Sequence, residues 1–192
     1  RVAHQEGLFT TATMMIGGGE TLEERLDHLD AIRELQDETG GFVAFIPWNV
    51  QLEGTPMQAS IERELGTVEY LKLLAVSRIY LNNIPNIQVS WPKEGPQFSQ
   101  VLLGVGVNDM GGTLMNESIS TSAGAQFGQL LRPMEIRQLI RDAGRIPAER
   151  YTSYKIKNVF DESDDPQEPL DMVGDDSEER FGSYQRLIKM DK

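Results

Sequence analysis

Cysteine is absent from the 192 residues of this sequence. The chain therefore forms no disulfide bond and offers no thiolate ligand to zinc or to an iron–sulfur cluster. Histidine is almost absent as well, since His4 and His28 are the only two, and neither has a second ligand at metal-binding spacing. We therefore predict no metal site in this chain and no catalytic arrangement of the Ser–His–Asp or Cys–His kind.

Long apolar runs are also missing. No run approaches the roughly 18 residues that a bilayer-spanning helix needs, so no membrane segment is predicted. Hydrophobic residues make up 39% of the chain and charged residues 25%, which excludes a wholly disordered or collagen-like chain. The sequence starts at Arg1 rather than at Met, so a targeting segment upstream would not be visible, and a cytoplasmic location is the default expectation.

Basic residues are outnumbered by acidic ones, 18 against 30, and the imbalance is concentrated in one stretch. Residues 161–180 contain ten acidic side chains and one arginine, so they carry −9 of the formal net charge of −12. We predict a nearly neutral domain over residues 1–160 and an acidic, disordered tail over residues 161–192. Because nucleic-acid binding needs a basic surface, no nucleic-acid partner is predicted.

Short apolar strands alternate with amphipathic helices along the predicted domain. The strands are expected at residues 10–16, 42–46, 86–91 and 105–109, and the helices at residues 22–39, 67–79, 96–102 and 133–143. This order indicates an α/β fold with a parallel sheet and right-handed crossovers, and the apolar strands suit a sheet covered on both faces. Four units fall short of a closed barrel of about 250 residues, so half of a barrel and a doubly wound open sheet both fit the pattern.

Several helices carry local signals for their ends and their buried faces. Thr21 and Glu24 have the spacing of a capping box, and Gly40 is placed to end the helix that they begin. The buried face of this helix is expected to consist of Leu22, Leu26, Leu29, Ile32 and Leu35. The face of the second helix, capped by Thr67, is expected to consist of Val68, Leu71, Ala75 and Ile79. The last helix, opened by Pro133, is expected to bury Ile136, Leu139, Ile140 and Ala143.

Three consecutive glycines, Gly17 to Gly19, separate the first strand from the first helix. They do not match the dinucleotide-binding fingerprint, which needs a glycine where Leu22 stands, and no GxxxxGK[ST] phosphate loop occurs. One interpretation is a tight strand-to-helix turn, because glycine relieves the steric limits there. The other is close approach of the backbone to a ligand, with Glu20 pointing into the site.

A basic segment begins with the last predicted helix. It contains Arg132, Arg137, Arg141, Arg145, Arg150, Lys155 and Lys157. Because surface charges are usually solvated, we favour a helix face that pairs with the acidic tail over a phosphate-binding site.

Unusual side chains gather at or just past the carboxyl ends of the predicted strands, namely Glu20, Trp48, Asn49, Trp91, Asn108, Asp109 and Thr113. In barrels and open α/β sheets alike, ligands bind at this edge. Both tryptophans of the chain lie there, and an exposed tryptophan beside carboxamides and carboxylates suits a planar aromatic substrate. The alternative is that the tryptophans pack beneath loops, since tryptophan is usually well buried.

Seven segments in order resemble the C-terminal half of the radical S-adenosylmethionine enzymes that make deazaflavin and menaquinone precursors. The segments are TTATMMIGGGET, ELQDETGGF, FIPWNVQLEGTP, LLAVSRIYL, NIQVSWPKEG, NDMGGTLMNESIS and AGRIPAER. The resemblance covers roughly residues 2–160. The chain departs from the group at Gly18, where histidine is usual, and at Pro92, where an apolar residue is usual.

The resemblance implies a fold and a cofactor. The fold is the second half of a (β/α)8 TIM-type barrel, and the first half, which carries the group's CxxxCxxC loop, lies outside this chain. In the parent enzyme a [4Fe–4S] cluster and S-adenosylmethionine generate a 5′-deoxyadenosyl radical. This chain alone lacks the cluster cysteines and is predicted to be inactive. Its implied partners are small-molecule substrates, the missing N-terminal half and a second subunit of the FO synthase.

Two branches of the group compete. NDMGGTLMNESIS and AGRIPAER resemble the subunit of deazaflavin (FO) synthase that transfers a 4-hydroxybenzyl group from L-tyrosine to 5-amino-6-(D-ribitylamino)uracil. FIPWNVQ and TLEERLDHL are more similar to cyclic dehypoxanthinyl futalosine synthase of menaquinone biosynthesis. We favour the first branch, because the NDMGGTLMNES run lies at the expected substrate end. A non-catalytic α/β module that binds a small aromatic ligand is the alternative from another class.

The resemblance and the positions at the strand ends together predict two groups of site residues. The candidates for the adenosylmethionine side are Gly17, Gly19 and Glu20. The candidates for the substrate side are Trp91, Asn108, Asp109, Thr113 and Glu117. No residue is assigned as a catalytic acid or base.

Overall fold

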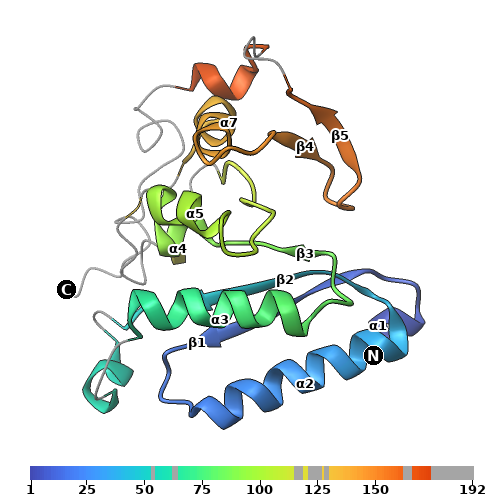
Figure 1. Ribbon diagram of the computed structural model, residues 1–192, viewed down its shortest axis with the longest axis vertical. Helices are drawn as coiled ribbons and strands as arrows, with labels where there is room; N and C mark the ends of the chain where they lie inside the picture. Colours follow the sequence, from blue (N-terminus) through green and yellow to red (C-terminus); the bar gives the residue numbers. More distant parts are fainter. Residues whose placement is uncertain are drawn as a thin grey trace, which may run out of the picture.

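The computed structural model describes residues 1–52, 55–61, 65–114, 119–120, 127, 130–161 and 166–173 (Figure 1). Its α-helices are α1 (Val2–Gln5), α2 (Leu22–Thr39), α3 (Thr67–Tyr80), α4 (Trp91–Glu94), α5 (Pro96–Leu102) and α7 (Pro133–Asp142). Its strands are β1 (Thr10–Ile16), β2 (Phe42–Asn49), β3 (Asn86–Ile87), β4 (Ala148–Arg150) and β5 (Ile156–Val159). Two short 3-10 helices are η1 (Pro56–Ser60) and η2 (Pro169–Met172).

A parallel sheet organises the first half of the chain, as the sequence predicts. Its strand order is β1-β2-β3, and β1 pairs with β2 from Thr10 opposite Phe42 to Ile16 opposite Asn49. Helices α2 and α3 run alongside these strands (Figure 1). The alternation of strand and helix therefore gives the α/β class and the parallel pairing that the sequence predicts.

The third and fourth strands are shorter than the sequence predicts. β3 covers Asn86–Ile87 alone, and the expected strand over residues 105–109 joins the sheet only through an isolated parallel bridge between Gln88 and Asp109. The expected strand over residues 86–91 is wrong at its end because Trp91 begins α4. Proline suits the first turn of a helix, where its missing N–H is not needed, so Pro92 continues a helix and does not follow a strand.

Helix α2 begins and ends where the sequence predicts. The Thr21 hydroxyl accepts a hydrogen bond from the Glu24 amide at 3.2 Å, the Glu24 carboxylate accepts one from the Thr21 amide at 2.7 Å, and Gly40 ends the helix at φ +61°. The predicted buried face is wrong in its first half, since Leu22 is 69% exposed and Leu26 is also exposed.

Helix α3 buries a different face from the predicted one. Its buried residues are Tyr70, Leu73, Leu74 and Ser77. Val68 and Ile79 of the predicted face are exposed, and the cap is Gly66 in place of Thr67. Apolar side chains occur all around this helix, so periodicity alone admits two faces. Packing against the sheet selects the face that carries Tyr70, because a large ring removes more apolar surface from water.

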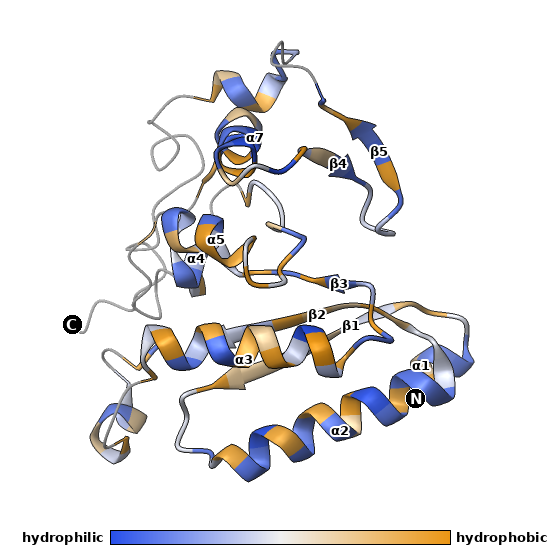
Figure 2. Ribbon diagram, viewed as in Figure 1, coloured by the Kyte–Doolittle hydropathy of each residue, from blue (hydrophilic) through white to orange (hydrophobic). Residues whose placement is uncertain are grey.

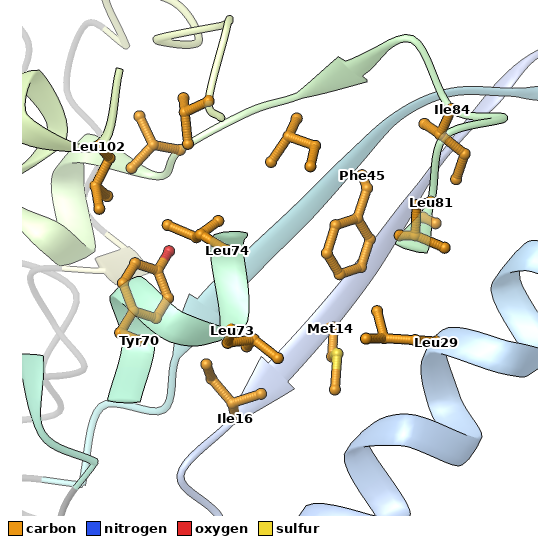
Figure 3. Close-up of a cluster of buried hydrophobic side chains, with 14 of the residues drawn as sticks. Met14, Ile16, Leu29, Phe45, Tyr70, Leu73, Leu74, Leu81, Ile84 and Leu102 are labelled. Carbon is orange, nitrogen blue, oxygen red and sulfur yellow. The ribbon is translucent and has the colours of Figure 1, made fainter. Parts of the chain in front are cut away.

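The core lies between the sheet and its two long helices. Met14 and Ile16 of β1, Phe45 of β2 and Leu29 of α2 point into one cluster (Figure 3). Figure 2 shows polar and apolar residues interspersed along α2 and α3. Among the described residues, no helix is both long and apolar enough to cross a membrane.

Only one face of β1 is covered. Ala12, Met14 and Ile16 are buried, while Thr11, Thr13 and Met15, which alternate with them, are exposed. The expectation of a sheet covered on both faces is therefore wrong for β1 in the described part of the chain. Because side chains alternate between the two faces of a strand, the uncovered face of β1 carries Thr11, Thr13 and Met15.

Residues 133–159 form a helix and an antiparallel hairpin. α7 begins at Pro133, and its predicted inward residues are packed against the core, namely Ile136, Leu139, Ile140 and Ala143. β4 and β5 pair in antiparallel fashion in a separate two-stranded sheet that the sequence reasoning missed. Figure 1 shows α7 and this hairpin on the opposite side of α4 and α5 from β1.

Part of the acidic stretch packs on the basic segment. The Arg137 guanidinium of α7, with a side chain only 6% exposed, pairs with Glu168 at 2.7 Å and with Asp171 at 3.2 Å. The same group lies 4.9 Å from the centre of the Phe160 ring. The expected pairing of basic helix and acidic tail thus occurs at η2, beyond the predicted domain boundary at residue 160. Residues 162–165 and 174–192 of the predicted tail lie outside the described residues.

Arg137→Ala is expected to destabilise the chain by about 1–3 kcal/mol, because it leaves the half-buried Glu168 and the buried Asp171 side chain without a cation. Thermal unfolding at neutral pH measures this change. The matched control is Arg145→Ala, since Arg145 is exposed, and it should change the free energy of unfolding by less than about 0.5 kcal/mol. Equal effects of the two variants would show that the η2 contact contributes no stability.

Candidate functional site

The carboxyl end of β1 leads into the predicted glycine turn, which is tight. Gly17 and Gly19 have φ of +87° and +102°, a region that favours glycine. The Gly17 amide donates to Glu20 Oε1 at 2.7 Å, the Gly18 amide donates to Glu20 Oε2 at 2.8 Å, and Arg25 Nε donates to Oε1 at 2.9 Å. The Glu20 carboxylate therefore folds back on its own turn, which matches the first of the two interpretations, a tight strand-to-helix turn.

Glu20 is charged at neutral pH. Burial disfavours the charged form, but the backbone amides and the Arg25 guanidinium outweigh it and hold the pKa of Glu20 below its usual range. The side chain therefore serves as a built-in anion for the turn, much as an external anion would bind exposed backbone amides.

A buried acid that sequence reasoning missed stands at the end of β2. Glu94, the last residue of α4, is 7% exposed. Its Oε1 accepts a hydrogen bond from the Asn49 amide at 3.1 Å, and its Oε2 accepts one from Asn49 Nδ2 at 2.9 Å. The segment WPKEG contains this acid, but its burial could not be predicted from sequence because Glu94 points inward only if α4 forms.

Burial raises the pKa of Glu94 to about 7, outweighing the two hydrogen bonds from Asn49 and the charge of Lys93. Burial and the nearby charge of Glu94 also raise the pKa of Tyr70. The Tyr70 hydroxyl donates a hydrogen bond to the Pro47 carbonyl at 2.9 Å. Asn49 Oδ1 is buried and has no hydrogen-bond partner. The end of β2 is therefore a packed polar site in which the Glu94 carboxyl gains or loses its proton near neutral pH.

Trp48 of β2 and Lys93 of α4 form a second contact between these two elements. Lys93 Nζ lies 5.0 Å from the centre of the Trp48 ring and donates to Ser120 Oγ at 3.0 Å. In the sheet, Trp48 stands opposite Met15, on the face that β1 leaves exposed. Two consecutive residues of α4 thus hold two consecutive residues of β2.

Trp91 is buried, with 1% of its surface exposed, and its indole N–H donates to the Gly112 carbonyl at 2.8 Å. The expectation of an exposed tryptophan is wrong at this position, and the alternative of packing beneath a loop is what the structure has. Because α4 begins at Trp91, the ring turns inward and ties the end of β3 to the loop after Asp109.

Asn108 lies at the amino end of the sheet. Its Oδ1 accepts hydrogen bonds from the Ile87 amide and from Arg78 Nη2, both at 2.9 Å, and its Nδ2 donates to Asn86 Oδ1 at 3.1 Å. Arg78 is in the last turn of α3 and Asn86 is the first residue of β3. The prediction that Asn108 lies at the carboxyl edge is wrong. Gln88 pairs with Asp109, and Asn108 therefore lies beside the start of β3.

Asp109 both caps a turn and forms an ion pair. Its Oδ1 accepts from the Gly111 amide at 2.7 Å and from Arg150 Nη2 at 3.0 Å, and Arg150 Nε bonds to its Oδ2. Arg150 also donates to Gln88 Oε1 at 3.2 Å, and the Tyr154 hydroxyl donates to the same oxygen at 2.8 Å. Tyr154 adopts φ +63°, and these contacts hold it in a region that favours glycine. Both carboxylate oxygens are thus used within the chain.

A cavity of about 910 Å³ lies beside this segment. Residues 107–113, α7, the β4–β5 hairpin and η2 line it. It brings together three of the predicted substrate residues, Asn108, Asp109 and Thr113, but not Trp91 or Glu20. Glu117, the remaining prediction, lies outside the described residues.

A protein-family model described as the CofH/MqnC C-terminal region matches residues 39–163. This chain belongs to the CofH/MqnC family. The match covers more than half of the chain and confirms the resemblance to radical S-adenosylmethionine enzymes of deazaflavin and menaquinone precursor synthesis.

Curated members of the CofH/MqnC family have different names. An aminodeoxyfutalosine synthase of Thermus thermophilus is 46% identical and shares 84% of this chain and 44% of its own. A 5-amino-6-(D-ribitylamino)uracil–L-tyrosine 4-hydroxyphenyl transferase of Methanosarcina mazei is 48% identical, with shares of 80% and 42%. A cyclic dehypoxanthine futalosine synthase of Halalkalibacterium halodurans is 44% identical, with shares of 82% and 42%. The chain therefore spans about two fifths of the length of these relatives.

Glu94→Gln is expected to remove a pH dependence of stability. Because the pKa of Glu94 is about 7 in the folded chain against an ordinary 4.5, its contribution is greatest below pH 4.5 and is lost as the pH rises to 7. Between pH 5 and pH 8 the chain should lose on the order of 2–3 kcal/mol from this group. A glutamine stays neutral, and a flipped Asn49 amide can accept from it.

Denaturant unfolding of the chain and of Glu94→Gln at both pH values measures this difference, and Glu34→Gln, an exposed change on α2, is the control. The same fall in stability with pH in Glu94→Gln as in the unaltered chain would contradict the assignment.

Asp109→Asn is expected to lower stability by about 1–3 kcal/mol, since asparagine can still cap Gly111 but leaves Arg150 without its charge partner. Chemical unfolding measures this change, and Asp27→Asn on the exposed face of α2 should have no effect. If the variant keeps its stability and the parent enzyme loses kcat/KM, the substrate role predicted from sequence is correct and the capping role is not.

Proposed function

We propose that this chain is the second half of a (β/α)8 barrel in a radical S-adenosylmethionine transferase of deazaflavin (FO) biosynthesis. The observation that carries this proposal is the one-sided sheet, in which Thr11, Thr13 and Met15 of β1 are exposed opposite a buried face. In a closed barrel such residues face the interior. The match covers about two fifths of each relative's length. This share is what we expect if each relative consists of a whole barrel plus a further segment.

The partner that we propose for the open sheet is the N-terminal half of the same parent protein. Among the described residues, the sheet has one free edge at β1 and another along the segment that contains Asp109. The cavity of about 910 Å³ lies beside this second edge, beneath α7. An added parallel strand would find unpaired backbone groups there and an apolar wall formed by residues such as Ile136 and Ile140.

The cofactors place a limit on what this chain contributes. Without cysteine, its residues do not fit the role of cluster ligands. Gly17, Gly19 and Glu20 remain our candidates for the adenosylmethionine side because of their place at the carboxyl end of β1. In the present arrangement, however, both Glu20 oxygens are occupied by its own turn and by Arg25, so a ligand there would have to displace one of these contacts. We derive no reaction step through either group.

The reaction that we propose for the parent enzyme transfers a 4-hydroxybenzyl group from L-tyrosine to 5-amino-6-(D-ribitylamino)uracil. It is supported by the NDMGGTLMNESIS segment and by the transferase relative at 48% identity. The menaquinone branch is the second candidate, because a cyclic dehypoxanthine futalosine synthase shares a similar part of the chain at 44% identity.

The decisive experiment uses the parent polypeptide that contains this chain, reconstituted anaerobically with iron and sulfide. With S-adenosylmethionine, L-tyrosine and the ribityl-aminouracil, it is expected to form the coupled product, detected by mass spectrometry. Turnover of a futalosine substrate alone would move the protein to the menaquinone branch. The 192-residue chain is the control and should stay colourless and cleave no S-adenosylmethionine, and a stoichiometric cluster on it would contradict the half-barrel proposal.

A further inference from the structure

Lys93 is a partly buried cation that forms no salt bridge with a described carboxylate, although its charge lowers the pKa of the adjacent Glu94. Its Nζ contacts the Trp48 ring and Ser120 Oγ, and no described aspartate or glutamate oxygen forms a salt bridge with it. An ammonium group has three hydrogen-bond donors, and Ser120 takes one of them. The described residues account for one of these three donors.

Trp48 gives this cation an aromatic neighbour on the open side of the sheet. Its ring is partly exposed, and its partner across the sheet, Met15, is 46% exposed. Both lie at the carboxyl ends of their strands, one position before the end of β1 and of β2. A flat apolar surface and a cation thus stand side by side at the edge where α/β proteins bind ligands.

Nearby acids do not cancel the charge of Lys93. Glu94 turns its carboxylate to Asn49, and because burial raises its pKa to about 7 it is largely neutral below that pH. Tyr70 packs near Glu94 and is neutral as well. Glu20 is compensated by Arg25. Counting the described residues, the charge beside Trp48 is therefore positive below about pH 7, which favours an anion.

We propose that Lys93 and Trp48 together bind a ligand that carries a carboxylate a few bonds from an aromatic ring. The carboxylate would accept charge-assisted hydrogen bonds from Lys93 Nζ, and the ring would lie against Trp48 and Met15. This inference rests on the proposed function, in which L-tyrosine is such a ligand, but it can be tested without turnover. The competing explanation is that Lys93 only pins the Trp48 ring in place.

Binding is measured on the 192-residue chain at pH 6.5 by titration calorimetry with three probes. The probes are L-tyrosine, 3-(4-hydroxyphenyl)propionate, which keeps ring and carboxylate, and tyramine, which lacks the carboxylate. Lys93→Met should weaken binding of the two carboxylates by about tenfold to a hundredfold, the usual range for a charge-assisted contact. Lys93→Arg should restore most of the affinity, and Lys72→Met, an exposed change on α3, should leave it unaltered.

Trp48→Leu supplies the second arm and should weaken both carboxylate probes by about tenfold while the chain stays folded by circular dichroism. Tyramine binding as tight as that of the propionate, or carboxylate affinity unchanged in Lys93→Met, would overturn the inference, as would no binding of either carboxylate. If the propionate binds and depends on Lys93 while the parent enzyme does not use L-tyrosine, the site stands and the proposed reaction fails.

Discussion

The burial of the Glu94 carboxylate against the end of β2 is the interaction on which the carboxyl edge of this protein depends. A buried acid must find hydrogen-bond donors, and Asn49 supplies two of them, one from its backbone and one from its side chain. This contact fixes α4, which then carries Lys93 to Trp48 and Trp91 to Gly112. Three strand ends are joined in this way, so α4, although only four residues long, organises the site.

In the described part of the chain, the sheet is covered on one side only. β1 buries every second residue and leaves the others exposed, and the edges of the sheet are open in the described part of the chain. The Arg150–Asp109 pair then attaches the β4–β5 hairpin to the end of the sheet, with Gln88 and Tyr154 as additional contacts. Asp109, a predicted substrate residue, thus also holds the hairpin.

Local signals in the sequence were sufficient where an interaction spans only a few residues. The capping box at Thr21, the glycine at Gly40 and the proline start of α7 are all formed as predicted. Each of these depends on hydrogen bonds within one turn of the chain, so the neighbouring residues alone decide it. The parallel sheet was also predictable, because strands that alternate with helices leave few other arrangements.

Tertiary packing decided what the sequence left open. α3 is apolar all around, so only contact with the sheet selects the face with Tyr70. Trp91 and Glu94 turn inward because α4 forms, beginning at the last residue of a predicted strand. Asn108 reaches the amino end of the sheet because of the pairing register. From sequence alone, Glu94 is one of many acids. Its burial, and with it a pKa of about 7, depends on Asn49, a residue 45 positions away. Such contacts depend on distance in space, and no pattern of neighbouring residues contains them.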